Sequence, residues 1–117
     1  KNNIDVASST WDAVHSGMRM VVESHSEFDG FPIAVAGKTG TAQQVPTRPN
    51  HALFVGYAPY EAPQISIATR IAYGYTSSNA IDLSRKVLSY CFGVEDETTL
   101  LNGQASNIAD NANGFAD

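Results

Sequence analysis

The sequence is poor in several kinds of residue, and each shortage excludes a class of protein. Its 117 residues include one cysteine, Cys91, so no disulfide can form within the chain. Only 16% of the residues are charged, and the seven Lys and Arg are scattered, so no basic patch points to a nucleic-acid partner. No apolar run approaches the length of a membrane span, and there is no signal-peptide pattern.

The charge that is present is unevenly distributed. The formal net charge is −5. Residues 1–94 hold seven basic and seven acidic side chains, whereas residues 95–117 hold five acidic side chains and no basic one. We therefore expect residues 1–94 to form the folded part of the chain. Residues 95–117 are expected to form an acidic, flexible C-terminal tail.

The hydrophobic pattern predicts two helices and three strands. Residues 8–25 have helical periodicity, and residues 78–90 predict a second helix, capped by Ser78 or Asn79 and ended by Gly93. Runs at residues 33–36, 52–57 and 65–71 predict strands, with turn-rich segments between them. Short connections favour antiparallel neighbours. The predicted fold class is α+β, in the order helix-strand-strand-strand-helix, with about three antiparallel strands packed against helices.

The same periodicity predicts which side chains are buried. One face of the first helix carries a set of apolar side chains: Trp11, Val14, Met18, Val21 and Val22. We expect Trp11 to pack in the core. The second helix is expected to bury four positions: Ile81, Val87, Leu88 and Cys91. Cys91 is therefore interpreted as a buried structural thiol rather than a nucleophile.

The residues with the clearest chemistry are Lys38, Thr39, Gly40 and Thr41, which provide a cation, two hydroxyls and close access to the backbone. In a strand, Lys38 and Gly40 would face one way, and the two threonines the other. Such a site suits an anionic, peptide-like ligand that pairs along the strand and places its carboxylate near the lysine and the hydroxyls. A turn with a solvated lysine would also explain an isolated Lys-Thr-Gly triplet, so the surrounding residues decide.

Those surroundings resemble the transpeptidase domain of the penicillin-binding proteins, a family of serine acyl-transferases. The matching segments are GKTGTAQ at residues 37–43, ALFVGYAP at 52–59 and PQISIA at 63–68. The resemblance extends over about residues 6–93. It is greatest to the high-molecular-weight class, class B, because of the Thr-Ala-Gln continuation and the Gly-Tyr-Ala-Pro strand. It implies the C-terminal part of a larger β-lactamase/transpeptidase-like fold.

Family members place three motifs around one cleft: Ser-x-x-Lys with the nucleophile, Ser-x-Asn, and Lys-Thr-Gly. Only the third is present here, because no serine is followed by a lysine three positions later. The Ser-x-Asn at residues 77–79 follows the Lys-Thr-Gly and is interpreted as a helix cap. The resemblance implies catalytic roles for Lys38 and Thr41. It implies substrate-binding roles for Lys38, Thr39, Gly40, Thr41 and Gln43, with no metal and no cofactor.

The function implied by the resemblance is that of a serine D,D-transpeptidase. Such an enzyme cross-links peptidoglycan stem peptides ending in D-Ala-D-Ala and is acylated by β-lactams. The implied partners are the remainder of the domain, which carries Ser-x-x-Lys and Ser-x-Asn, the stem peptide and β-lactams. The implied location is the extracytoplasmic face of a bacterial cell membrane, anchored by a segment upstream of Lys1. The isolated chain is predicted to be inactive.

Other interpretations remain open at this stage. A non-catalytic β-lactam sensor or a peptide-binding module on the same fold would keep the same motif. A carboxypeptidase or a β-lactamase has a similar Lys-Thr-Gly. A phosphate-binding P-loop also ends in Gly-Lys-Thr, but it needs a glycine where this chain has Pro32, and a helix where a proline-containing loop follows. The histidines, His15, His25 and His51, lack metal-ligand spacing.

Overall fold

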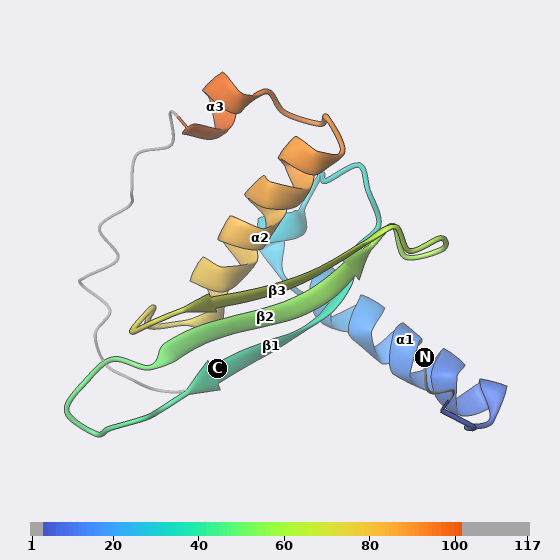
Figure 1. Ribbon diagram of the computed structural model, residues 1–117, viewed down its shortest axis with the longest axis horizontal. Helices are drawn as coiled ribbons and strands as arrows, with labels where there is room; N and C mark the ends of the chain where they lie inside the picture. Colours follow the sequence, from blue (N-terminus) through green and yellow to red (C-terminus); the bar gives the residue numbers. More distant parts are fainter. Residues whose placement is uncertain (1–3, 102–117) are drawn as a thin grey trace.

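A computed structural model describes residues 4–101 of the chain, and Figure 1 shows its helices and strands. The elements are α1 (Ser8–Glu23), the 3₁₀ turn η1 (Ser26–Phe28), β1 (Ala36–Ala42), β2 (His51–Ala58), β3 (Ile65–Ile71), α2 (Ser77–Cys91) and α3 (Glu97–Leu101). The predicted α+β class and the order helix-strand-strand-strand-helix are confirmed. The short elements η1 and α3 were not predicted.

The three strands form one antiparallel sheet in the order β1-β2-β3. The register pairs Ala36 with Tyr57 at one end of β1 and Ala42 with His51 at the other. Within the described residues, β2 is central and β1 is an edge strand. Because side chains alternate along a strand, the sheet has two distinct faces.

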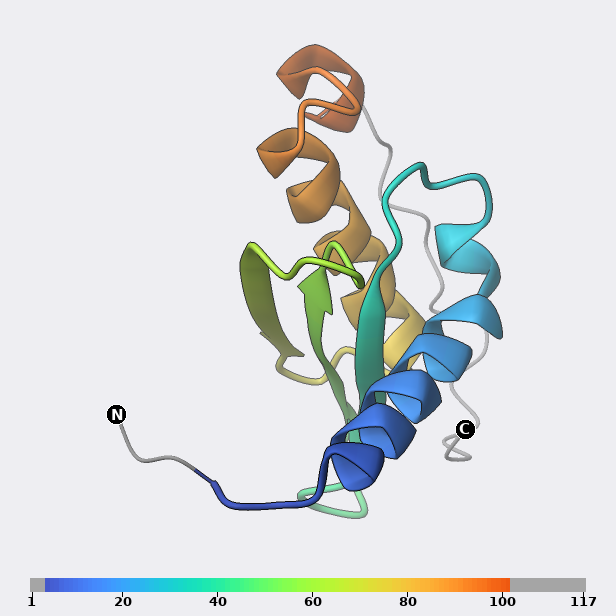
Figure 2. The same ribbon diagram turned by 90° about the vertical axis from the view of Figure 1, so that its right-hand side faces the viewer.

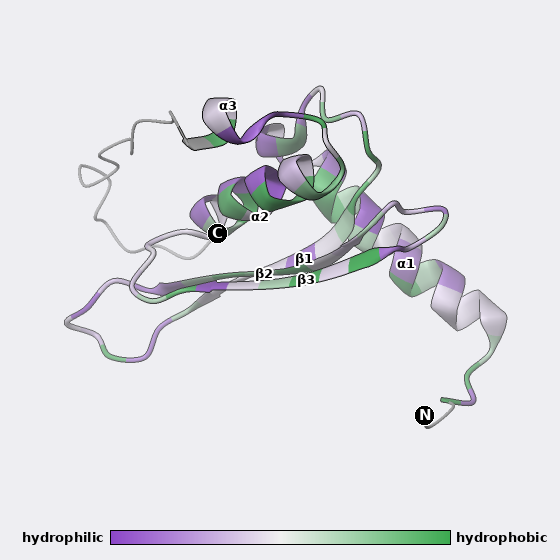
Figure 3. Ribbon diagram, turned by 45° about the horizontal axis from the view of Figure 1, so that its top comes forward, coloured by the Kyte–Doolittle hydropathy of each residue, from purple (hydrophilic) through white to green (hydrophobic). Residues whose placement is uncertain are grey.

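We call the two faces the helix-covered face and the open face. The helix-covered face carries the side chains of Thr39, Thr41, Ala52, Phe54, Ala58, Ile65, Ile67, Thr69 and Ile71. The open face carries those of Lys38, Ala42, Leu53, Val55, Tyr57, Ser66, Ala68 and Arg70, with Gly40 in the same row. Figure 3 views the sheet nearly edge-on, with α2 along one side of it.

The hydrophobic core lies between α2 and the helix-covered face. Its buried members are Val22, Phe28, Val35, Ala52, Phe54, Ala58, Ala80, Ile81 and Leu88. Phe54 is central in the sheet and only 1% exposed. The buried stripe of α2 includes small residues such as Ser84, whose hydroxyl donates to the Ala80 carbonyl oxygen at 2.6 Å and lies 2.7 Å from Thr69 Oγ1. Small residues on this stripe let α2 approach the sheet closely.

Two paired glycines make room for the Phe54 ring. Gly37 of β1 lies opposite Gly56 of β2. A Cβ on Gly37 would come within 2.4 Å of Phe54 Cζ, and one on Gly56 within 2.9 Å of Phe54 Cε1. Both positions also face a backbone carbonyl oxygen at 2.7 Å, so no side chain fits at either. The residue just before the Lys-Thr-Gly motif is therefore set by core packing.

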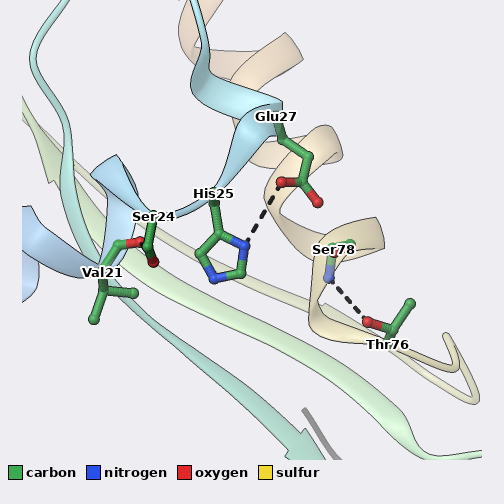
Figure 4. Close-up of polar contacts among 6 residues, drawn as sticks. All are labelled: Val21, Ser24, His25, Glu27, Thr76 and Ser78. Carbon is green, nitrogen blue, oxygen red and sulfur yellow. Dashed lines mark hydrogen bonds and ion pairs between the residues drawn. The ribbon is translucent and has the colours of Figure 1, made fainter.

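The helix ends depart from their predicted caps. Helix α2 begins after Thr76, whose hydroxyl accepts a hydrogen bond from the Ser78 N–H at 3.4 Å (Figure 4). The predicted cap at Ser78 or Asn79 is therefore wrong by two or three residues. Asn79 instead lies in the first turn and donates from its side chain to the Gly74 carbonyl oxygen at 2.8 Å. Gly93, with φ of +65°, follows α2 as predicted.

Several predicted core positions are exposed. Trp11 is 40% exposed and Val14 is 48% exposed, because the N-terminal part of α1 projects past the end of the sheet (Figure 1). Figure 2 shows α1 beside β1, and only Val22 of this helix is buried. The predicted burial of Val87 and Cys91 is also wrong. Both lie outside the buried stripe of α2, while Ile81 and Leu88 are fully buried as predicted.

The acidic C-terminal stretch contains one short described element. Helix α3 begins after Asp96, whose carboxylate accepts the Thr99 backbone N–H at 2.7 Å. This backbone hydrogen bond and the Thr99 side chain lower the pKa of Asp96. The predicted flexible tail otherwise falls on residues 102–117, which lie outside the described residues.

Candidate active site

The Lys-Thr-Gly motif lies inside a strand rather than after one. The predicted strand at residues 33–36 is wrong in its limits, since β1 begins only at Ala36 and continues through Ala42. The carbonyl groups just before it are bound elsewhere. The Ala34 oxygen accepts the Tyr60 N–H at 2.7 Å, and the Val35 oxygen accepts Arg19 Nη1 at 2.8 Å. Pairing with β2 at seven positions then holds the motif in an extended conformation.

The side chains of the motif alternate as the sequence predicted. Lys38 lies on the open face opposite Val55, is exposed, and donates from Nζ to the carbonyl oxygen of Thr39 at 2.9 Å. Thr39 and Thr41 lie on the helix-covered face and are partly exposed, because β1 is an edge strand. Gln43 follows the strand and is exposed. The edge of β1 thus presents a cation on one side and two hydroxyls on the other.

Gly40 is the only motif residue without a side chain to project, and its neighbour uses the space. A Cβ on Gly40 would lie 3.3 Å from Leu53 Cβ and 3.4 Å from Leu53 Cδ1. These distances are tight, so Leu53 would have to shift to admit an alanine. Because Gly40 has no side chain, nothing projects from the open face at this position between Lys38 and the end of the strand.

A shallow groove of about 370 Å³ lies on the open face beside the row that contains Lys38. Its lining includes Val55, Tyr57 and Ala68 from the sheet and Met18 from α1. The Tyr57 hydroxyl is buried and has no hydrogen-bond partner within the described residues. Burial raises the pKa of Tyr57, with smaller contributions from Tyr60 and Glu61. A buried hydroxyl without a partner costs about 1–3 kcal/mol, so the Tyr57 side chain is held here at a cost in stability.

A polar cluster that the sequence did not reveal lies at the far end of the motif strand. Its centre is His51, the first residue of β2, which is 6% exposed. The imidazole contacts Gln44 after β1 and Arg70 of β3. Its ring centroid lies 4.9 Å from that of Tyr73. His51 was expected to be a surface or packed histidine, and it is packed; its partners come from three segments that no sequence pattern links.

The turn from β3 to α2 has an unusual backbone that this cluster supports. Tyr73 and Tyr75 have φ of +55° and +67°, in the left-handed region, which costs about 1–3 kcal/mol each for non-glycine residues. The Tyr75 N–H donates to the carbonyl oxygen of buried Asn50 at 3.0 Å. Arg48 donates to the Tyr73 hydroxyl at 2.8 Å and lies 5.2 Å from its ring centroid. These contacts tie the turn to the β1–β2 loop.

Residues 4–101 contain no group of three His, Cys, Asp or Glu side chains that could hold a metal ion. None of the helices in that range is both long enough and apolar enough to cross a lipid bilayer.

Comparison with known proteins identifies the same domain along most of the chain. Residues 1–89 match the model of the penicillin binding protein transpeptidase domain. Peptidoglycan D,D-transpeptidase MrdA of Haemophilus influenzae is 33% identical over 102 residues, which cover 70% of this chain and 16% of that protein. MrdA of Escherichia coli K12 is 26% identical over 115 residues, 82% of this chain and 18% of that protein. The chain therefore spans less than a fifth of the length of these curated relatives.

Solved structures of similar proteins share the fold. PBP2 of Pseudomonas aeruginosa, in complex with WCK 5153, is 31% identical with a TM-score of 0.69, over 83% of this chain and 22% of that one. The D,D-transpeptidase domain from Eggerthella lenta is 31% identical with a TM-score of 0.65, over 76% and 21%. Penicillin-binding protein A of M. tuberculosis, as an imipenem acyl-enzyme complex, is 25% identical with a TM-score of 0.66, over 74% and 20%.

Proposed function

The chain belongs to the penicillin-binding protein transpeptidase domain family, and we propose that it forms the substrate-binding strand of a serine D,D-transpeptidase. The observation that carries this proposal is the position of Lys38, Thr39 and Thr41 on an edge strand with all three side chains at least partly exposed. The parent enzyme would cross-link peptidoglycan stem peptides. β-Lactams would acylate it, as imipenem acylates penicillin-binding protein A of M. tuberculosis.

The substrate would bind as an added strand along β1. An edge strand leaves every second N–H and C=O unpaired, so an extended peptide can add hydrogen bonds without disturbing β2. The terminal carboxylate of D-Ala-D-Ala would accept hydrogen bonds from the Thr39 and Thr41 hydroxyls, near the charge of Lys38. Gly40 and Gln43 would line the same strand. The enzyme would therefore recognise the peptide through backbone pairing and through contacts with its terminal carboxylate.

The chemistry would be acyl transfer through a covalent intermediate. A serine in the remainder of the domain attacks the carbonyl carbon of the penultimate D-Ala, and the bond to the terminal D-Ala breaks. D-Ala leaves as a free amino acid, and an amine of a second stem peptide takes the acyl group and releases the serine. The Thr41 N–H would donate to the oxyanion, which requires it to point away from β2. One such donor typically contributes a factor of about 10²–10³ in rate.

Lys38 would act on the serine hydroxyl of the Ser-x-Asn motif. An exposed lysine on the open face can hydrogen-bond a group from another segment, because among the described residues its Nζ is held by the neighbouring Thr39 carbonyl oxygen alone. Its positive charge would also favour the anionic substrate and the oxyanion. This role requires the segment with Ser-x-Asn to lie against the open face.

The remainder of the domain is the first partner that this proposal requires. The open face carries Val55, which is 49% exposed and lines the groove. We propose that the segments with Ser-x-x-Lys and Ser-x-Asn cover this face. We also place the parent protein at the extracytoplasmic face of the bacterial membrane, held by an upstream anchor.

The test is the acylation rate of the full-length protein with a fluorescent penicillin. Replacing Thr39 with Val keeps the shape of the side chain and removes one hydrogen bond to a carboxylate, a loss of about 1.5–3 kcal/mol. Acylation should fall at least ten-fold. Thr47→Val, in the exposed β1–β2 loop, is the matched control and should acylate at the wild-type rate. An unchanged rate in Thr39→Val would contradict the carboxylate-binding role.

A further inference from the structure

One arrangement of the His51 ring protons satisfies its contacts with both Tyr73 and Gln44. Nδ1 lies 3.0 Å from the backbone nitrogen of Tyr73, and Nε2 lies 2.8 Å from Gln44 Oε1. The Tyr73 N–H can only donate, so Nδ1 must accept and be unprotonated. The single proton of the neutral ring then lies on Nε2 and is donated to Gln44. Both ring nitrogens of this buried side chain are therefore used.

Arg70 lies beside the same ring nitrogen as Gln44. Its Nη2 lies 3.4 Å from His51 Nε2. Because a guanidinium can only donate and Nε2 carries the ring proton, this contact is not a hydrogen bond, and Gln44 Oε1 is the acceptor of the Nε2 proton. The described charged or titratable groups that contact the ring or its partner are Arg70, Tyr73 and Arg48.

The contacts of His51 converge on the end of the motif strand. His51 pairs across the sheet with Ala42, the residue after Thr41, and its ring holds Gln44, the residue after Gln43. Gln44 is itself exposed and lies two residues beyond the end of β1, so its bond to His51 is the described side-chain contact that holds the chain where it leaves the strand. The same ring binds the β3–α2 turn through the Tyr73 N–H.

We propose that His51 is a positioning residue for the Lys-Thr-Gly strand, acting through its hydrogen bond to Gln44. This inference rests on the proposed function, because it assigns His51 the task of holding Thr41 and Gln43 in register with the substrate. Pairing with β2 holds the strand as far as Ala42, and the bond to Gln44 extends this support to the chain beyond it, where Gln43 lies. The oxyanion donor and Gln43 then keep their direction when a substrate strand is added.

Two conservative replacements separate the two bonds of His51. In His51→Gln the side-chain amide reaches the position of Nε2, so it keeps the bond to Gln44 and loses the acceptor for the Tyr73 N–H. In His51→Asn the side-chain oxygen lies near the position of Nδ1, so it keeps the acceptor for Tyr73 and loses Gln44. Gln44→Leu removes the same bond from the exposed partner, where folding is not at risk.

The experiment measures fluorescent-penicillin acylation of the full-length protein at several concentrations, with thermal unfolding of each variant. His51→Asn and Gln44→Leu should each lower the maximal acylation rate about ten-fold, with little change in the half-saturating concentration. The double variant His51→Asn/Gln44→Leu should be no slower than either single one, because both remove one bond. His51→Gln should keep most of the wild-type rate even where its unfolding temperature falls.

The outcomes distinguish this inference from the proposed function. If the wild-type protein is not acylated, the proposed function fails and this inference fails with it. If the wild-type protein is acylated but Gln44→Leu and His51→Asn are equally fast, only the positioning role is contradicted. It is also contradicted if the two losses add in the double variant, or if acylation simply follows unfolding temperature and His51→Gln is as slow as His51→Asn.

Discussion

The two faces of the sheet differ in how far the residues of this chain cover them. The helix-covered face is closed within the chain, since α2 packs on Phe54 and its neighbours and leaves them buried. The open face leaves Val55 half exposed and Lys38 in solvent, and it carries Tyr57, whose buried hydroxyl has no partner among the described residues. Helix α1 reaches this face through Met18 in the groove and through His15, whose ring lies 5.6 Å from that of Tyr57.

The helix-covered face stabilises the fold, whereas the open face carries the lysine of the candidate site. The face that folds the chain uses apolar and small side chains with internal partners. The face that carries Lys38 leaves Lys38 and Val55 exposed, although His51 at its end is buried and bonded to Gln44 and Tyr73. The motif strand β1 connects the two, since Thr39 and Thr41 point to the first face and Lys38 to the second. A substrate bound along the edge of β1 would therefore contact a backbone that is supported from the helix-covered face. Catalytic groups from other segments of the domain would reach it from the open face.

The largest expected effect is the loss of the closed core. Replacing Phe54 with Ala in the full-length protein should cost about 3–5 kcal/mol, because the removed ring is buried and fills the space above Gly37 and Gly56. Thermal unfolding followed by circular dichroism measures the loss. Leu83→Ala on the outer side of α2 is the control, since Leu83 is 44% exposed and should cost much less. Equal losses in both variants would place the core elsewhere.

A smaller effect tests whether the open face is covered in the parent protein. Val55 and Leu83 are exposed to similar extents in this chain, at 49% and 44%. If the remainder of the domain packs on the open face, Val55→Asp places a carboxylate in an apolar contact and should cost about 1–3 kcal/mol in the full-length protein. Leu83→Asp should cost well under that. Equal unfolding temperatures for the two variants would mean that the open face remains in solvent.

Much of the helix-covered face could be predicted from the sequence, because it follows simple periodicity. Alternation along the predicted strand at residues 52–57 puts Phe54 on the other face from Leu53 and Val55, as observed, and helical spacing predicted the burial of Ile81 and Leu88. The errors arise where an apolar helix face continues beyond the part of the helix that packs against the sheet. Trp11 continues the apolar pattern of α1, but the helix extends past the sheet and leaves it exposed.

The helix α2 shows a different source of error. Its buried stripe contains Ser77, Ala80 and Ser84, residues that an apolar pattern does not select. Val87 was selected because it is apolar, yet it lies away from the sheet. Close packing favoured small side chains over hydrophobic ones.

The candidate site also has one part that the sequence reveals and one part that only the folded structure reveals. Lys38, Thr39, Gly40, Thr41 and Gln43 are adjacent in sequence, so a motif reveals them together. The cluster around His51 joins Gln44 and Tyr73, which lie 7 residues before it and 22 after it, and only the folded sheet brings these together. Neither the left-handed backbone of Tyr73 nor the orientation of an imidazole has a signature in one sequence.

The central claim is that this chain supplies the substrate-binding strand while the nucleophile lies in another segment. The direct measurement is peptide mapping by mass spectrometry of the full-length protein after acylation by a penicillin. The account predicts one acyl group, on a serine of a Ser-x-x-Lys outside these 117 residues, and no labelling of the isolated chain. An acyl group on any residue between Lys1 and Asp117, or covalent labelling of the isolated chain, would contradict it.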